Sequence, residues 1–281
     1  MTSESFVAAK QSLALRLANT CLTTLYRILP RWAYDRMYFF LFLHYKNLRR
    51  DGYRRKALRR QGADAAKIEV VHHCLKFSLV GWQGMEVTYD CTKKIIGEKV
   101  PGALVECGVA QGGSALLIGL VNQKFGDGSR RLWLFDSFEG LPEPTMEDFK
   151  GGKTGDHVRP LPKGSCLGTI EEVRGLLYEQ HSLPQASIEL VKGWFQDTLP
   201  KTRARVGSIA LLRLDGDWYE STKVCLETMF DQVSERGYVI LDDYFTCFGC
   251  KRATDEFLAA RGKHYQIIPD GRGGAYFQKL G

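Results

Sequence analysis

Two apolar runs of this sequence end in pairs of acidic residues, and these acids are the first candidates for chemistry. "LLRLDGDWYESTK" (211–223) places Asp215 and Asp217 on either side of one glycine, and "GYVILDDYF" (237–245) ends in Asp242 and Asp243. A carboxylate is costly in apolar surroundings unless something compensates its charge. We therefore expect these side chains to face water at strand ends, or to hold a cation, a substrate or a proton.

The pattern around these runs indicates an α/β fold with a mostly parallel sheet and helices on both faces. From Pro101 onward, short apolar runs alternate with segments of helical spacing, and the chain finishes with a probable hairpin. Such alternation is typical of parallel sheets, in which ligands bind beyond the carboxyl ends of the strands. We expect strands at 102–108, 130–138, 187–195, 208–217 and 237–244, a helix after the fourth that runs to about 235, and a long loop at 140–168. We also expect a helix-prone region at about 64–98 and a helix at 169–180, where Thr169 is the N-cap with a Glu three residues on.

Adjacent fourth and fifth strands would bring Asp215, Asp242 and Asp243 into one cleft. Three neighbouring carboxylates repel one another, and a hard divalent cation with oxygen ligands relieves that repulsion. Mg²⁺ fits best, and calcium or manganese could substitute. Such a cation would lower the pKa of a substrate hydroxyl, and Asp217 could take its proton as general base. The alternative is an acidic cluster without a metal.

The glycine-rich stretch "VECGVAQGGS" (105–114) predicts a cofactor loop between a strand and a helix. It is not the dinucleotide pattern G-x-G-x-x-G but reads E-x-G-x-x-x-G, the pattern at which S-adenosylmethionine binds. Glu106 could meet the ammonium group of that cofactor, and loop amides could meet its carboxylate. The alternative is a purely structural glycine turn.

Two further motifs fit the same cofactor. Asp136 in "LFDSFEGLP" (134–142) follows Gly112 by 24 residues, which suits an acid that binds ribose hydroxyls at the next strand end. "KGWFQDTLP" (192–200) ends the third strand, where an adenine could pack near Trp194. The alternatives are an exposed strand-end aspartate and an aromatic side chain that anchors the core.

Five motifs in order resemble the macrocin O-methyltransferase (TylF-type) family: "VPGALVECGVAQGGSA", "LFDSFEGLP", "GWFQDTLP", "LLRLDGDWYEST" and "YVILDDYFTCFGCKRATDEF". The resemblance covers about 75–281. It implies a class I S-adenosylmethionine-dependent enzyme that needs magnesium and methylates hydroxyls, in many members those of sugars on antibiotics. The cofactor residues we then expect are Glu106, Gly108, Gln111, Gly112, Ser114, Asp136, Ser137, Gly193, Trp194, Phe195 and Asp215.

The first 75 residues read as a helical extension ahead of a methyltransferase domain at 76–281. Within the extension, residues 46–60 hold eight Lys or Arg and one Asp, a net charge of +7 that equals the charge of the whole chain. This segment is either a solvated helix face or a contact for a membrane surface or an acidic partner. Nucleic acid is not expected, because no recognition motif accompanies the charge.

The apolar run "MYFFLFL" (37–43) is too short for a bilayer span, which needs about 20 residues. It could lie in a membrane interface, pack on the domain or join two subunits, and the resemblance implies a homo-oligomer. The N-terminus lacks the features of a signal peptide, so we expect a cytoplasmic protein with reduced thiols. A position at the periphery of a membrane, through 31–60, is the open alternative.

The identity of the hydroxyl acceptor stays open at this level. A sugar or polyol of a natural product or glycoconjugate is the first hypothesis, and a catechol or other phenol is the second, because both present paired oxygens to a cation. A third hypothesis, from another class, is a non-catalytic binding or scaffold protein that retains the fold.

Overall fold

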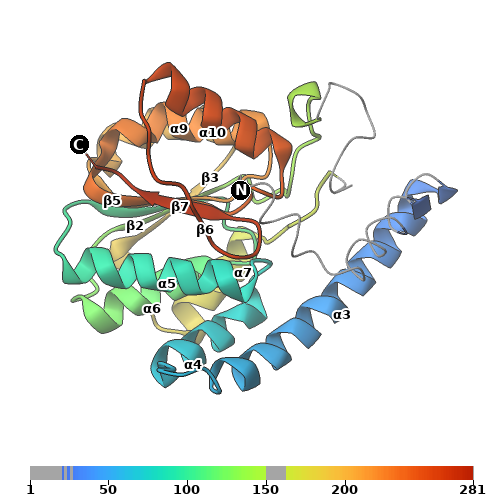
Figure 1. Ribbon diagram of the computed structural model, residues 1–281, viewed down its shortest axis with the longest axis horizontal. Helices are drawn as coiled ribbons and strands as arrows, with labels where there is room; N and C mark the ends of the chain where they lie inside the picture. Colours follow the sequence, from blue (N-terminus) through green and yellow to red (C-terminus); the bar gives the residue numbers. More distant parts are fainter. Residues whose placement is uncertain (1–20, 22–23, 26–27, 150–162, 281) are drawn as a thin grey trace.

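A seven-stranded sheet forms the centre of the protein, for which the computed structural model describes residues 21, 24–25, 28–149 and 163–280 (Figure 1). The order of the strands across the sheet is β3-β2-β1-β4-β5-β7-β6. Their bounds are β1 Ala103–Cys107, β2 Leu132–Asp136, β3 Ile188–Lys192, β4 Ile209–Leu214, β5 Val233–Leu241, β6 Ile268–Pro269 and β7 Ala275–Gln278.

The first five strands pair in parallel, whereas β7 runs antiparallel to both β5 and β6. This arrangement confirms the predicted α/β class with a mostly parallel sheet, and it confirms the C-terminal hairpin. Because β1, β4 and β5 are neighbours, the acids that follow them share one edge of the sheet.

Helices cover both faces of the sheet, as Figure 1 shows. On one face lie α4 (Ala65–Cys74), α5 (Trp82–Gly97) and α6 (Gly113–Phe125), packed on Leu104, Leu134 and their neighbours. On the other face lie α8 (Phe195–Val206), α9 (Tyr219–Met229) and α10 (Phe248–Ala260), packed on alternate strand residues such as Val105 and Phe135. Burial on both faces explains why the strands read as nearly continuous apolar runs.

The N-terminal part is dominated by helix α3 (Arg31–Ala57), which extends away from the sheet in Figure 1. Its C-terminal end joins the main core through Tyr53 and Ala57, and the Tyr53 ring stacks on Trp82 at 5.4 Å. The division of the chain at residue 75 stays a prediction. Within the described ranges, no helix combines the length and the apolar character needed to cross a membrane.

Three expected elements have different bounds in the structure. The helix-prone region 64–98 is two helices, α4 and α5, separated by a 3₁₀ turn at Leu75–Phe77 and an extended stretch. The helix after β4 ends at Met229 rather than near 235, because Val233 is already buried in β5 opposite Ile209. The expected strand 208–217 ends at Leu214, so Asp215 and Asp217 lie in the turn that follows.

The helix expected at 169–180 begins as predicted, with reciprocal hydrogen bonds between Thr169 and Glu172 at its start. It forms α7 (Ile170–Arg174) and then continues as a π-helix, Gly175–Gln180. The loop expected at 140–168 contains one short 3₁₀ turn, Met146–Asp148, and its residues 150–162 lie outside the described part.

None of the eight cysteines forms a disulfide. Six are buried, namely Cys74, Cys91, Cys107, Cys225, Cys247 and Cys250.

Candidate active site

The acids predicted at the strand ends meet at one edge of the sheet. Carboxylate oxygens of Asp215, Asp242 and Asp243 all lie within 4.8 Å of one another. A second group of possible ligands, Asp217, Asp243 and Cys247, satisfies the same limit and shares Asp243 with the first. The predicted neighbourhood of β4 and β5 therefore does bring these side chains together.

Arg213 lies in the middle of this cluster, and the sequence analysis did not single it out. Its guanidinium is fully buried and donates from Nη1 to Glu106 Oε1 at 3.0 Å and to Asp215 Oδ2 at 2.9 Å. Its Nη2 donates to Asp242 Oδ1 at 2.8 Å. The signal that could have found it is a charged residue inside the apolar run "IALLRL", because a buried charge needs partners.

Burial and like charge shift the titration of these groups. Burial raises the pKa of Glu106 to about 7, although Arg213 and Ser114 lower it. Burial also raises the pKa of Asp215 well above its ordinary value, and the charge of Asp242 adds to that shift. Burial lowers the pKa of Arg213, but its acidic neighbours outweigh this effect and raise it. The cluster thus favours additional positive charge or protons.

This donor set fits a divalent cation. Every ligand atom of the Asp215, Asp242 and Asp243 group is a carboxylate oxygen, the type that hard cations prefer. Arg213 uses only one oxygen each of Asp215 and Asp242. Arg272 lies farther off, with its Nη1 3.6 Å from Asp242 Oδ2. Counting Glu106, the cluster holds four carboxylates, three of which bind the buried guanidinium of Arg213, while Arg272 lies at its edge. Acidic groups thus outnumber the basic ones, which leaves room for the charge of a cation.

The glycine loop lies directly against the turn that carries Asp215. Gly108 has a φ of +95°, and a Cβ at this position would lie 1.8 Å from the Asp215 carbonyl oxygen, so only glycine fits. Gly112, with a φ of +84°, precedes helix α6. Asp136 fastens this loop, since its Oδ2 accepts from the amides of Val109 at 2.7 Å and Ala110 at 3.0 Å.

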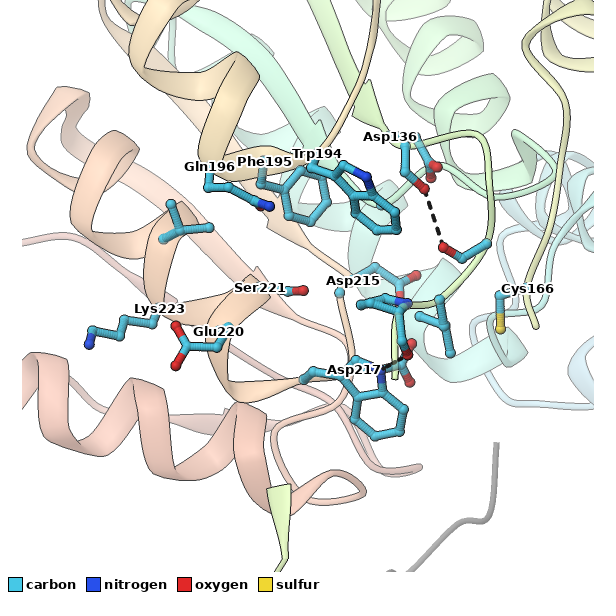
Figure 2. Close-up of a pocket in the computed structure, with 18 of the residues that line it drawn as sticks. Asp136, Cys166, Trp194, Phe195, Gln196, Asp215, Asp217, Glu220, Ser221 and Lys223 are labelled. Atoms are coloured by element: carbon cyan, nitrogen blue, oxygen red, sulfur yellow. Dashed lines mark hydrogen bonds between the residues drawn. The ribbon is translucent and has the colours of Figure 1, made fainter. Parts of the chain in front are cut away.

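A cavity of about 630 Å³ opens beside this loop (Figure 2). Seven of the residues predicted for the site line it: Gly108, Asp136, Ser137, Trp194, Phe195, Asp215 and Asp217. Figure 2 shows the side chains of Trp194 and Asp136 near each other, with those of Asp215 and Asp217 below them. One cavity therefore joins the predicted ribose and adenine residues to the predicted base.

The other predicted residues lie outside the cavity wall. Glu106, Ser114, Asp242 and Asp243 are buried behind it, Gln111 and Gly112 lie in the glycine loop, and Gly193 lies in the turn after β3. Glu106 contacts Arg213 rather than the cavity, so a role at the cofactor ammonium stays a prediction. The cavity also shows lining residues that the sequence analysis missed, among them Cys166, Gln196, Glu220 and Ser221.

Asp217 occupies a constrained position on the cavity wall. Its φ is +56°, a left-handed conformation that is uncommon outside glycine. Only 7% of the residue is exposed, and Cys247 Sγ donates to its Oδ1 at 3.6 Å. The carboxylate is thus held in one place by its backbone and its surroundings.

The comparisons with known proteins identify the family. Residues 23–279 match the family described as "Macrocin-O-methyltransferase (TylF)". The chain belongs to this family. Its relatives include the demethyldecarbamoylnovobiocin O-methyltransferase of Streptomyces niveus, which is 36% identical over 72% of this chain and 75% of that protein. The mycinamicin III 3''-O-methyltransferase of Micromonospora griseorubida is 26% identical over 72% of this chain and 78% of its own length.

The fold of this TylF-family protein also matches solved methyltransferases. The O-methyltransferase NovP superimposes with a TM-score of 0.65 at 34% identity, over 73% of this chain and 83% of that one. The calicheamicin methyltransferase CalS11 covers 95% of this chain with a TM-score of 0.54, and at 19% identity it supports the fold alone. The protein is therefore an S-adenosylmethionine-dependent O-methyltransferase with a Rossmann-like fold.

In this TylF-family enzyme, the segment 140–149 supplies part of the cavity wall, through Gly140, Leu141, Pro142, Glu143 and Thr145. Asp148 is buried, and its carboxylate accepts from the amides of Tyr219 at 2.6 Å and Thr145 at 2.8 Å. The Trp218 indole donates to the Pro142 carbonyl at 3.1 Å. The wall is thus tied to the first residues of α9, directly after Asp217.

Proposed function

We propose that the protein moves a methyl group from S-adenosylmethionine to a hydroxyl of a sugar or polyol, on a natural product or a glycoconjugate, with the help of a divalent cation. The observation that carries this proposal is the position of Asp217. It lines the same cavity as Asp136 and Trp194, beside the Asp215, Asp242 and Asp243 cluster.

The cofactor end of the cavity suits a nucleoside with an amino-acid tail. S-adenosylmethionine supplies an activated methyl group, so the protein's task is to place and deprotonate the acceptor. The Asp136 carboxylate accepts three backbone hydrogen bonds, from Val109, Ala110 and Phe138. A carboxylate has about four acceptor sites, so one remains for a ribose hydroxyl. Trp194 and Phe195 offer aromatic surface for the adenine.

The acceptor end needs a base, since an alcohol is a poor nucleophile near neutral pH. Asp217 would take the hydroxyl proton, and its fixed backbone keeps the carboxylate at the cavity wall. Asp215, Asp242 and Asp243 would hold the cation. When bound, a divalent cation supplies the positive charge that lowers the pKa of a hydroxyl beside it.

The relatives support a sugar as the acceptor. One relative from Streptomyces olivaceus is 35% identical over 66% of this chain and 69% of its own length. Its name is 8-demethyl-8-(2,3-dimethoxy-alpha-L-rhamnosyl)-tetracenomycin-C 4'-O-methyltransferase. That name places the methylated oxygen on a sugar-bearing compound. Acceptor profiling with glycosides, polyols and catechols tests this part of the proposal, because methylation of catechols alone would contradict it.

Calorimetric titration tests the cofactor and the cation without any acceptor. We expect S-adenosylmethionine and S-adenosylhomocysteine to bind, and magnesium to bind with a heat that disappears in Asp215→Ala and in Asp242→Ala. A protein that binds the cofactor but no divalent metal would contradict the metal-assisted mechanism. It would leave the methyltransferase assignment intact.

Asp217→Asn tests the base. We expect turnover to fall by about 10²–10⁴-fold, the usual contribution of a general base, while cofactor affinity changes little. Asp197→Asn is the matched control, because Asp197 is an exposed aspartate that does not line the cavity. A large loss of cofactor affinity in Asp217→Asn with unchanged turnover would rule out the base assignment.

A further inference from the structure

Helix α3 carries an unusual share of the exposed apolar surface. Eleven large hydrophobic side chains are exposed in the described part of the chain, and four of them lie in α3: Trp32, Phe40, Leu41 and Leu48. Two more, Ile28 and Leu58, lie just outside the two ends of the helix. Isolated exposed hydrophobic residues are ordinary, but a concentration on one element indicates a contact surface.

The C-terminal end of α3 is attached to the domain by side-chain contacts. There, Tyr53 donates from its hydroxyl to Glu86 at 2.8 Å, and Arg60 pairs with the same carboxylate at 2.9 Å. Arg54 pairs with Glu69 at 2.7 Å. Toward the N-terminal end, Tyr34 is buried, whereas Trp32 is 73% exposed and Phe40 is 67% exposed. Among the described side chains, exposed apolar groups thus occur along α3 as far as Leu48.

The same outward side becomes basic near its C-terminal end. Arg55, Lys56 and Arg59 are exposed there, within the segment 46–60 whose net charge is +7. At 100° per residue, Phe40, Leu48 and Arg55 fall on one side of the helix, opposite the buried Tyr53 and Ala57. The exposed His44 and Asp51 fall on that side too. Among the described side chains, the apolar groups are thus followed by a basic end that contains one acidic group.

We propose that the outward side of α3 docks on a bilayer that contains anionic phospholipids. Aromatic and aliphatic side chains would enter the interface, and the basic end would lie at the headgroups. Each Lys or Arg near an anionic surface strengthens binding severalfold, and the positive charge here is concentrated rather than spread over the protein.

A second copy of the chain fits this surface less well. Two α3 helices packed in parallel would bring two segments of net charge +7 together, which costs free energy. An antiparallel pair would place each basic end against the aromatic end of the other. An anionic surface meets both kinds of side chain at once.

Vesicle sedimentation tests the proposal with the intact protein. We expect binding to vesicles of phosphatidylcholine mixed with phosphatidylglycerol, no binding to phosphatidylcholine alone, and weaker binding at high salt. Neutralising the basic end in R55Q/K56Q/R59Q should weaken the partition coefficient by about a hundredfold. The matched control, K124Q/K201Q/K263Q, removes three exposed charges elsewhere and should bind like the parent protein.

Quenching by brominated lipid locates the contact. Phe40→Trp places a tryptophan on the outward side of α3, and brominated lipid in anionic vesicles should quench its fluorescence more than that of the parent protein. The proposal is overturned if anionic vesicles bind no protein, or if the control variant loses as much binding as R55Q/K56Q/R59Q. It is also overturned if F40S/L41S/L48S turns an oligomer into a monomer and the parent shows no vesicle binding.

Discussion

Replacing Arg213 by methionine should be among the most damaging single changes in this protein. The guanidinium has no exposed surface and binds three carboxylates, of which Glu106 is fully buried and Asp242 is 6% exposed. Removing one member of a buried ion pair leaves the other charge uncompensated, at a cost of about 3–5 kcal/mol. Since domains are stable by only about 5–15 kcal/mol, Arg213→Met should lose a large part of its stability.

The loss of stability in Arg213→Met should depend on pH. Without Arg213, the pKa values of Glu106 and Asp215 rise further, so the folded variant holds protons that the unfolded chain releases. Protons relieve the buried charge, so we expect Arg213→Met to be less destabilised near pH 6 than near pH 8. Urea unfolding at each pH measures this difference.

A double-mutant cycle with Glu106→Gln measures the interaction energy between Arg213 and Glu106. Arg213 Nη1 and Glu106 Oε1 lie 3.0 Å apart, so the two substitutions should not be additive, and the double variant should be less damaged than the sum by about 0.5–3 kcal/mol. Arg236→Met is the control. Arg236 makes an equally short ion pair with Glu98, at 2.8 Å, but is 56% exposed, so its loss should cost about 0–1 kcal/mol.

The reasoning is refuted if Arg213→Met costs no more than Arg236→Met, or if the cycle is additive. Should Arg213→Met not fold at all, Arg213→Lys keeps one positive charge and supplies the measurable variant. It should lie between the parent and the methionine variant.

Three further outcomes follow from the structure. Gly108→Ala should lower cofactor affinity at least about tenfold, because its Cβ would meet the Asp215 carbonyl oxygen in addition to the strain of a positive φ. Gly164→Ala is the control, since it is also at positive φ but in open space and should show only the strain of about 1–2 kcal/mol; calorimetric titration of the cofactor into both variants distinguishes them. Asp148→Asn should raise the acceptor KM more than the cofactor Kd, because Asp148 ties the wall 140–149 to α9; Glu147→Gln, its neighbour in an ion pair with Arg252, is the control in steady-state kinetics. Burial raises the pKa of Glu106 from 4.5 to about 7, so the folded state binds this proton more tightly than the unfolded chain, and the stability that Glu106 contributes falls as the pH rises between those values. Urea unfolding from pH 5 to 8 should show that the free energy of unfolding depends less on pH in Glu106→Gln than in the parent, and an unchanged pH dependence would contradict the assignment.

The sequence predicts the fold and the acidic cluster well for a simple reason. A parallel sheet places every strand's carboxyl end on one edge, so strand-end acids of neighbouring strands must meet there. Asp215, Asp242 and Asp243 do so once β4 and β5 pair. Glycines that need a positive φ, such as Gly108 and Gly112, are equally local signals.

Side-chain partners across strands are what the sequence could not provide. Glu106 and Arg213 are opposite one another in the register of β1 and β4, although 107 residues separate them in the chain. No local pattern specifies that pairing. For the same reason, the sequence analysis expected Glu106 to contact the cofactor and did not show that Arg213 pairs with it instead.

The position of the cavity wall at 140–149 could not be predicted from local sequence patterns either. Its sequence, "GLPEPTMEDF", contains one glycine and two prolines and predicts only a loop. The carboxylate of Asp148 determines where that loop lies, through the amide of Tyr219, 71 residues further along the chain. Residues that line the cavity from α9, such as Ser221, follow from the same long-range contact.

The six buried thiols described above allow local opening of this protein to be measured from the reactivity of its own cysteines. Cys74 and Cys91 lie on one side of the sheet, Cys107 and Cys225 on the other, and Cys247 and Cys250 at the start of α10. A thiol reagent reacts only with an exposed sulfur, so the labelling rate at each position measures how often its surroundings open. Comparing rates with and without S-adenosylhomocysteine would show which layer of the protein opens less often when this ligand is bound, using the native chain and no introduced cysteine.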